Sequence, residues 1–531
     1  MVCMLAPVLA TAADLPPTPG SVSQSLPSLA TPLVTPAQIL IPDQPGPVLH
    51  DRNGHRFQIH AFRFAGNTVF PAARLKEVVD RFRDLELNLY DLNVAADAVT
   101  EFYHDRGYTL ARAVVPPQKV EDGVVTLAVV EGRIGRVLFS GNSSYSEDFL
   151  RRHTPSLVPG VLATTEMLER SLLLLNDLPG LKVRSTLSPG SEFGAADVLV
   201  KAEEQRFGAS ISIDNAGRKE TGRTRVDLGG NLNNPLGIGD QIDLHFLVTD
   251  RRLMQFGRIG YSLPLSDDGL RFTVAHSEVH YDVAGIFAAL GLDGRVRSNE
   301  FGLQYAARRT RGENLSYTLS YKSSRQIQRA FGVETSSVYL PLVTAGVLYN
   351  LVGEDASVTN ASATLATNFR SHNHSFAQNA ELARIEVDAN HLQPVDRFWD
   401  IYLRGNLVLS KEQLPDSEKF SLGGPGSVRA YRASELRGDA GAQGTLEIRR
   451  SLMLAAMPAS ISFFGDVGRV IYKAPGLRDG WESLAGVGVG LTLYPARQTI
   501  VKVEVATPAG GNYHAADGNR GRVWASVSFS Y

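Results

Sequence analysis

Alternating apolar and polar residues dominate the chain from about residue 205 to its C-terminus. In residues 241–249, Ile242, Leu244, Phe246 and Val248 take every second position, with mostly polar residues between them. The same alternation recurs in residues 398–409, 499–505 and 523–531. A period of two predicts a β-strand with one apolar and one polar face. We expect about sixteen antiparallel strands of this kind, each of about 9–12 residues.

The alternation alone permits two all-β classes, a soluble sandwich and a membrane barrel. Strands of about 9–12 residues match a tilted membrane crossing. The polar face also carries charged residues in mid-strand, such as Asp243 and Glu504, as a water-filled interior permits. We therefore predict an all-β transmembrane barrel over residues 205–531.

Two shorter segments before the barrel mix helices with strands. Residues 55–133 predict the order strand, helix, helix, strand, strand, at residues 57–64, 71–80, 91–106, 111–117 and 124–132. Residues 134–204 predict a smaller version, with a strand, a helix and two strands at residues 134–140, 164–175, 182–187 and 196–202. Both segments place a Gly-Asn turn after their first strand, at Gly66-Asn67 and Gly141-Asn142. The shared order indicates two small α+β domains and favours an internal repeat.

The N-terminal 54 residues predict little regular structure. Residues 1–13 are apolar, and Ala10-Thr11-Ala12 fits a signal-peptide cleavage site. Since a basic region is missing, we interpret them as a truncated signal peptide or a late start; a disordered N-terminus is the alternative. Residues 14–54 are rich in proline, serine and threonine, which indicates an extended linker with at most one short helix, within Ser21–Leu29.

Composition narrows the function classes. The 531 residues carry 53 basic and 55 acidic side chains, a net charge of −2, which argues against a basic nucleic-acid-binding protein. Hydrophobic residues make up 43%, as expected of a folded chain. No apolar run reaches the roughly 18 residues that a transmembrane helix needs. The single cysteine, Cys3, excludes a disulfide within the chain and a cysteine-rich zinc site.

Candidate catalytic and cofactor motifs are absent from the sequence. His50, His55 and His60 lie near one another, but their spacing is not that of a metal site. No nucleophile elbow with suitable partners is found. Gly486, Gly488 and Gly490 alternate along a strand and do not form a dinucleotide fingerprint. We therefore predict a protein that is not an enzyme and holds no metal or cofactor.

The strongest candidate site joins a long loop to a downstream strand. Residues 411–445 are the longest predicted loop late in the chain and contain GGPGSVRAY at 423–431. No Lys followed by Ser or Thr completes a phosphate-binding loop, and a mobile surface loop is the alternative. In FFGDVG, residues 463–468, Asp466 interrupts an apolar strand between glycines, which marks the close approach of another segment. We expect Arg429 to enter the barrel and form a bidentate pair with Asp466.

With these motifs in this order, the chain resembles the outer-membrane transporters of two-partner secretion, the haemolysin secretion/activation family of the Omp85 superfamily. The resemblance spans nearly the whole chain. GYTLAR at 107–112, VPPQ at 115–118 and VEG at 130–132 resemble the family's first POTRA domain. DNAG at 214–217, TGR at 221–223 and NPLGIGD at 234–240 resemble its first barrel hairpins. The glycine-rich loop resembles the family's pore loop with its V-R-G-Y core, and Phe464, Asp466 and Gly468 match its F-x-D-x-G strand motif.

The resemblance implies a domain order and two sets of site residues. It implies a plug helix and linker at 14–54, POTRA domains at 55–133 and 134–204, and a barrel at 205–531 with its pore loop at 411–445. The residues implied to lock the loop in the barrel are Val428, Arg429, Tyr431, Phe464, Asp466 and Gly468. Phe529 and Tyr531 resemble the C-terminal signal read by barrel-assembly machinery. Ala430 stands where the family usually has glycine; if that position needs a positive φ, alanine costs on the order of 1 kcal/mol.

The function implied by the resemblance is secretion, with or without activation, of a large partner exoprotein such as an adhesin or haemolysin. POTRA domains in the periplasm would capture the partner, and a barrel in the outer membrane of a Gram-negative bacterium would conduct it. The implied partners are the exoprotein, outer-membrane lipids and barrel-assembly machinery, and no nucleic acid. Two alternatives stay open: an Omp85 barrel-assembly factor, expected to carry more POTRA domains, and a diffusion porin, which would not need residues 56–203.

Overall fold

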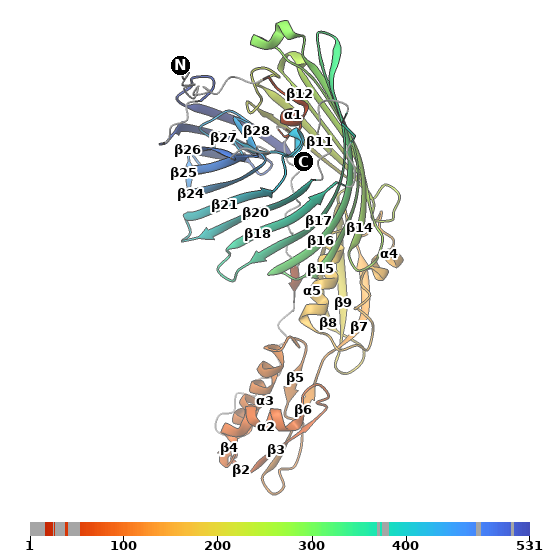
Figure 1. The fold of residues 1–531 in the computed structure, drawn as a ribbon. Helices are drawn as coiled ribbons and strands as arrows, with labels where there is room; N and C mark the ends of the chain where they lie inside the picture. Colours follow the sequence, from red (N-terminus) through yellow and green to blue (C-terminus); the bar gives the residue numbers. More distant parts are fainter. Residues whose placement is uncertain are drawn as a thin grey trace. The chain divides into compact units, whose positions relative to one another are not determined.

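The computed structural model describes residues 16–24, 26, 38–40, 54–368, 372–373, 382–473, 479–510 and 515–531 (Figure 1). The chain divides into two compact units, one of residues 1–33, 206–308 and 312–531, the other of residues 34–205 and 309–311. The signal segment predicted at residues 1–13 lies outside the described residues. No helix in the described part of the chain has the length and apolar character needed to cross a membrane.

The first small domain packs three helices onto two short sheets. Strands β2 (Phe57–Ile59) and β4 (Leu85–Leu87) pair with each other, and β3 (Ala61–Ala65), β6 (Val124–Val130) and β5 (Arg112–Val114) form a second sheet in that order. The helices are α2 (Ala72–Val79), η1 (Asp80–Phe82) and α3 (Leu89–His104). Apolar residues of α2, α3 and both sheets form one buried core, which includes Leu75, Val99 and Leu127. The single strand expected over 57–64 is two strands, because the backbone changes its pairing partner at His60.

The second small domain contains one larger sheet with two helices. Its strand order is β1 (Gln38–Leu40), β8 (Leu181–Pro189), β9 (Ala195–Glu204) and β7 (Arg133–Ser140). Its helices are α4 (Glu147–Arg152) and α5 (Thr165–Asn176), and Leu150, Leu172 and Val198 lie in its core. The sequence predicted neither α4 nor β1, because α4 is only six residues long and β1 is a three-residue parallel addition beside β8.

The two small domains repeat one backbone arrangement at their Gly-Asn turns. Gly66 and Gly141 have φ values of +82° and +78°. A Cβ added to Gly66 would lie 2.3 Å from the carbonyl oxygen of Val129, and one added to Gly141 would lie 2.4 Å from that of Ala202. Each turn therefore requires glycine for both its conformation and its close approach to a neighbouring strand.

A glutamate two residues beyond each of those carbonyls holds the turn. Glu131 accepts hydrogen bonds from the backbone N–H groups of Thr68 and Val69, at 2.5 and 2.7 Å. Glu204 accepts from those of Ser143 and the next residue, both at 2.8 Å. Burial opposes the ionisation of Glu204, but the serine and backbone hydrogen bonds outweigh it and lower its pKa to about 2. The pKa of Glu131 is lowered in the same way. The matched turns and carboxylates support the internal repeat.

The other unit is a closed antiparallel β-barrel whose long strands follow chain order, so the predicted fold class is confirmed (Figure 1). Sixteen long strands belong to it among the described residues. They are β10 (Phe207–Asp214), β11 (Arg225–Asn233), β12 (Gln241–Thr249), β13 (Met254–Pro264), β14 (Leu270–Asp282), β15 (Asp293–Arg309), β16 (Glu313–Ala330), β17 (Val333–Val352), β18 (Val358–Thr367), β20 (Ala383–Pro394), β21 (Trp399–Ser410), β24 (Ala440–Leu454), β25 (Met457–Tyr472), β26 (Gly480–Ala496), β27 (Thr499–Pro508) and β28 (Arg522–Ser530). The two-residue β19 (His372–Asn373) pairs with β17, and β10 closes the barrel against β28.

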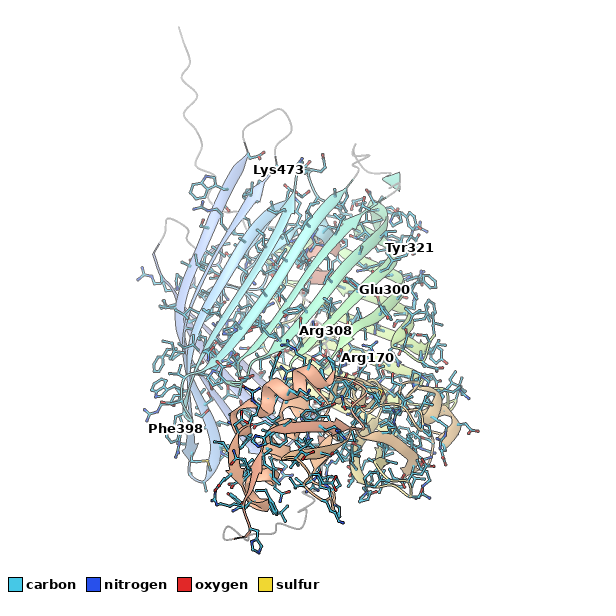
Figure 2. All side chains as sticks on the ribbon, turned by 90° about the horizontal axis from the view of Figure 1, so that it is seen from below. Arg170, Glu300, Arg308, Tyr321, Phe398 and Lys473 are labelled. Atoms are coloured by element: carbon cyan, nitrogen blue, oxygen red, sulfur yellow. The ribbon has the colours of Figure 1, made fainter. Side chains whose placement is uncertain are left out.

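The predicted alternation separates the outside of the barrel from its interior. On β12, Leu244 and Phe246 face outward and are 55% and 44% exposed. Between them, His245 faces inward and its Nε2 lies 2.7 Å from a carboxylate oxygen of Asp227. Figure 2 shows side chains along the whole wall, with Lys473 and Phe398 at opposite ends of the strands.

The segment between β21 and β24 is folded into the barrel as a hairpin. It contains η4 (Asp416–Glu418), β22 (Phe420–Leu422) and β23 (Leu436–Gly438), and β22 pairs with β23. We refer to residues 411–439 as the inserted hairpin. The predicted loop extended to residue 445, but residues 440–445 belong to β24; their small side chains (AGAQGT) hide the strand signal. Two short 3₁₀ helices, η2 (Asp250–Arg252) and η3 (Gly285–Leu290), lie in other loops.

The short N-terminal helix α1 (Pro19–Gln24) belongs to the barrel unit. It begins two residues earlier than the helix expected within Ser21–Leu29, because Thr18 and Ser21 cap each other: the N–H of Ser21 donates to Thr18 Oγ1 at 3.2 Å, and the N–H of Thr18 donates to Ser21 Oγ at 2.9 Å. Pro19 then takes the first helical position, which suits its fixed φ.

Candidate functional site

Glycines on the inner wall make room for the inserted hairpin. A Cβ at Gly468 would lie 2.6 Å from Leu422 Cδ2, and one at Gly441 would lie 2.1 Å from the ring of Phe420. The hairpin and the wall share one apolar cluster that includes the fully buried Val428 and Tyr431. Gly468 of the predicted strand motif therefore serves the site by leaving space for the hairpin rather than by bonding to it.

Arg429 at the tip of the inserted hairpin binds carboxylates from three barrel strands. Its Nε and Nη2 donate to the two oxygens of Asp466, each at 2.9 Å, and its backbone N–H donates to the same carboxylate at 3.1 Å. Its Nη1 donates to Glu447 at 3.1 Å and to Glu504 at 2.7 Å. The expected pairing of Arg429 with Asp466 is present in the structure, within a larger network.

Two further cations balance this network. Arg449 Nε lies 2.9 Å from Glu447, and Lys502 Nζ lies 2.9 Å from Glu504. Three carboxylates therefore face three cations. The side chains of Arg429, Asp466, Glu447 and Glu504 are all less than 8% exposed, so their interactions are little screened by water.

Two aromatic residues complete the binding site of Arg429. The guanidinium carbon lies 3.3 Å from the centroid of the Phe464 ring, a cation–π contact. From β28, Trp524 Nε1 donates to the carbonyl oxygen of Arg429 at 2.7 Å. Side chains from β24, β25, β27 and β28 thus meet at one arginine.

Ala430 fits this site without backbone strain. It is not among the residues with positive φ, so the penalty considered for alanine at this position does not arise. Its side chain is fully buried and faces β26, where a Cβ added to Gly486 would lie 2.5 Å from the Cβ of Ala430. The glycine at 486 accommodates the alanine at 430.

The two C-terminal residues expected to form an assembly signal lie apart from this network. Phe529 is 41% exposed on β28, where it pairs with Ile211 of β10. Tyr531 is 68% exposed, and its backbone exchanges hydrogen bonds with Ala209 at 2.8 and 3.2 Å. Both residues therefore lie at the closing pair of strands.

Helix α1 contacts the base of the inserted hairpin. Gln24 Nε2 donates to the carbonyl oxygens of Ser417 and Lys419, at 3.0 and 2.5 Å. Arg437 donates to Gln24 Oε1 at 3.3 Å, to Thr18 Oγ1 at 3.2 Å and to an Asp416 oxygen at 2.6 Å. Val22 is buried in an apolar cluster with residues of β12–β15. The helix and the hairpin base form one hydrogen-bonded group.

The sequence did not identify Glu447, Glu504 or Trp524 as members of the site. A usable signal was present, since both acids occupy the polar face of otherwise apolar strands. In the described part of the chain, no group of three or more His, Cys, Asp or Glu side chains is arranged to hold a metal ion.

A closed barrel with a hairpin held inside it, preceded by two small α+β domains, defines a class of β-barrel proteins whose pore is filled by a segment of the same chain. Residues 194–493 match the family described as haemolysin secretion/activation protein ShlB/FhaC/HecB, and residues 57–132 match the ShlB-type POTRA domain. The chain belongs to this family, the outer-membrane transporters of two-partner secretion. The barrel lies in the outer membrane and the POTRA domains in the periplasm.

Individual relatives agree with this family assignment. The chain is 26% identical over 472 residues to the heme/hemopexin transporter protein HuxB of Haemophilus influenzae, covering 85% of this chain and 83% of that one. It is 24% identical over 441 residues to the outer membrane transporter CdiB of Escherichia coli, covering 76% and 70%. The solved structure of CdiB from Escherichia coli matches 91% of this chain and 92% of its own, with a TM-score of 0.73 at 20% identity, which supports the fold.

Proposed function

We propose that this protein secretes one large exoprotein, its partner in two-partner secretion, through the barrel and that it catalyses no reaction. The observation that carries the proposal is the inserted hairpin, which Arg429 holds against the inner wall. A pore filled by a segment that side-chain contacts hold in place can be cleared by releasing that segment, without unfolding the barrel.

The domain roles follow the family order. We assign residues 55–133 and 134–204 to two POTRA domains that capture the partner, residues 14–54 to the plug helix and linker, and residues 205–531 to the barrel. Support for two POTRA domains comes from the matched turns that Glu131 and Glu204 hold. Support for the plug comes from the contacts of α1 with the hairpin base.

Capture of an extended partner segment has a physical basis in the exposed sheet edges. In the second domain, β7 is an edge strand of the sheet β1-β8-β9-β7, and in the first domain β3 is an edge of β3-β6-β5. An edge strand presents unpaired backbone N–H and C=O groups, to which an extended chain can add as another strand.

Release of the plug and of the hairpin is coupled in this proposal. Arg437 of the hairpin base donates to both Thr18 and Gln24, so removing α1 breaks hydrogen bonds of the hairpin as well. We assign Val428, Arg429 and Tyr431 to the hairpin side of the lock, and Phe464, Asp466 and Gly468 to the wall side.

Deleting the gene in its native host tests the proposed function. We expect one large protein to disappear from the culture medium while the other outer-membrane barrels keep their abundance, and restoring the gene should restore the secreted protein. A barrel-assembly factor would instead deplete many barrels. A porin would leave the secreted proteins unchanged and alter the uptake of small solutes.

Two further partners belong to the proposal. The outward apolar residues, such as Leu244 and Phe246, suit contact with lipid chains. The exposed C-terminal aromatics Phe529 and Tyr531 suit recognition by barrel-assembly machinery before the barrel closes.

A further inference from the structure

Four asparagines form a hydrogen-bonded row across the inner wall, away from the lock. Asn314 on β16, Asn350 on β17, Asn360 on β18 and Asn390 on β20 are direct register partners of one another. Each donates its side-chain N–H to the side-chain oxygen of the next, at 2.9, 2.9 and 3.0 Å. The row faces the interior, because the outward neighbours Tyr317 and Leu351 are 50% and 40% exposed.

Over the next three register rows beyond this row, the inner faces of β16, β17 and β18 carry no charge; the following inner residue of β16 is Lys322. Three more register rows follow it, and their inner residues are all small or uncharged: Ser316, Leu348 and Ser362; Thr318, Gly346 and Thr364; Ser320, Thr344 and Ala366. A Cβ added to Gly346 would lie 2.7 Å from Thr318 Oγ1 and 3.0 Å from Thr364 Cγ2, so these side chains share one face. We call these four rows, from Asn314, Asn350 and Asn360 to Ser320, Thr344 and Ala366, the neutral track.

The strands on one side of the neutral track, β20 and β21, carry charged inner side chains instead. On β20 and β21, Arg384 bonds to Glu418 at 2.9 Å, and Arg404 bonds to Asp388 at 3.2 Å and to the carbonyl oxygen of Gly426 at 3.3 Å. These charged side chains hold the inserted hairpin. The neutral track is therefore a stretch of wall that the hairpin's charged contacts leave unused.

The track lies at the periplasmic half of the barrel. β10 begins at the end of the barrel where the chain arrives from the second small domain, so the turns at residues 310–312 and 353–357 lie at the same, periplasmic end. Asn314 is the first inner residue of β16 after the turn at 310–312. Asn350 and Asn360 are the second inner residues of β17 and β18, counted from the turn at 353–357. A polypeptide that enters from the periplasm meets the asparagine row early.

We propose that the neutral track binds the main chain of the exported polypeptide in extended form; this inference rests on the proposed secretion function. Inner side chains repeat every two residues along a strand, about 6.6–6.8 Å, which is also the two-residue repeat of an extended cargo. Asn350 and Asn360 each use one N–H and one oxygen lone pair in the row, which leaves one N–H and one lone pair of each for a peptide group. Neutral amides and hydroxyls bind every sequence alike and weakly, whereas charges would retain some segments and repel others.

Single-channel recording with the purified full chain tests the track. The probe is an unfolded, uncharged Gly/Ser/Asn polypeptide added from the periplasmic side, and the measurement is the dwell time of its current blockades. The track variants are Asn350→Leu with Asn360→Leu, and Thr318→Val with Thr364→Val, which keeps shape and removes hydroxyls. The matched control is Ala361→Leu, which changes the outward face of β18.

We expect the track variants to keep the ion conductance of the control and to shorten the dwell time about two- to tenfold for each hydrogen bond lost. Polyethylene glycol of similar size, whose ether oxygens accept hydrogen bonds but which donates none along its chain, should lose less dwell time in the track variants than the polypeptide does. Dwell times equal to those of the Ala361→Leu control would overturn the track. If the asparagine variant fails to fold, as judged by heat-modifiable mobility, the Thr318→Val, Thr364→Val variant decides.

The outcome separates the track from the proposed function. A dwell time that depends on the track shows that the track binds an extended main chain. If deleting the gene also leaves the secreted proteins unchanged, the secretion function is overturned, and with it the assignment of the bound chain as exported cargo. Loss of one secreted protein on gene deletion, together with unchanged dwell times, would overturn only the track.

Discussion

Replacing Arg429 by methionine should release the inserted hairpin. The substitution removes four side-chain hydrogen bonds, two to Asp466 and one each to Glu447 and Glu504. It leaves three carboxylates facing two cations in a region less than 8% exposed. Removing one partner of a buried ion pair costs about 3–5 kcal/mol, and the lower end applies beside a water-filled pore. About 3 kcal/mol corresponds to a roughly 100-fold larger released population.

Cysteine labelling measures that population. Ser434 lies in the hairpin and is 8% exposed, so Ser434→Cys in a Cys3→Ser background gives a single thiol that is shielded while the hairpin is seated. We expect a membrane-impermeant maleimide to label this thiol about 100-fold faster when Arg429→Met is added. The control is Arg429→Met with Asp466→Leu, which restores the charge balance and should slow labelling again, since an unpaired buried charge is the main penalty.

Suppose that both Arg429 variants are labelled at the rate of the parent protein, which carries only Ser434→Cys and Cys3→Ser. The apolar cluster around Val428 and Tyr431 would then hold the hairpin without help from the charges. Equal acceleration in both would show that Arg429 acts through its own hydrogen bonds, and that charge balance among the carboxylates contributes nothing.

Three other perturbations have defined outcomes. Gly486→Ala should unseat the hairpin, because its Cβ would lie 2.5 Å from that of Ala430; the same thiol assay should show faster labelling, with recovery when Ala430→Gly is added. Gly20→Val should displace α1, because a Cβ there would lie 2.4 Å from the backbone of Asp416; planar-bilayer recording should show higher conductance, and a conductance equal to the parent protein would refute the contact. Glu204 has a pKa of about 2 in the folded protein against an ordinary 4.5, so the stability it contributes is present above about pH 4.5 and is lost as the pH falls toward 2. Thermal unfolding of residues 54–205, followed by circular dichroism, should lose stability over that range, and Glu204→Gln should flatten the dependence; identical pH profiles would contradict the role of this carboxylate.

Much of the barrel could be predicted from the sequence because period-two alternation is local. Leu244 and Phe246 belong to the outer face whatever their strand pairs with. The ends of strands were harder to predict where the residues are small, as in the first six residues of β24. The strand over residues 57–64 was predicted as one, because its break at His60 depends on two different partners.

The site was only partly predictable for the same physical reason. The pairing of Arg429 with Asp466 was expected from two motifs, each visible in the sequence. Glu504 and Trp524 lie 75 and 95 residues from Arg429 in the chain and meet it only when the strands close into a barrel. Alternation tells which face a residue occupies, but the register between distant strands decides which inner side chains meet.

The charge balance at the inserted hairpin has a consequence for ion flow. While Arg429 is seated, Glu447, Asp466 and Glu504 are matched by three cations. Once the hairpin leaves, the same patch of wall keeps one excess negative charge and attracts positive counter-ions. Departure of the hairpin therefore widens the channel and shifts its permeability toward potassium over chloride, so the reversal potential in a salt gradient reports where the hairpin is.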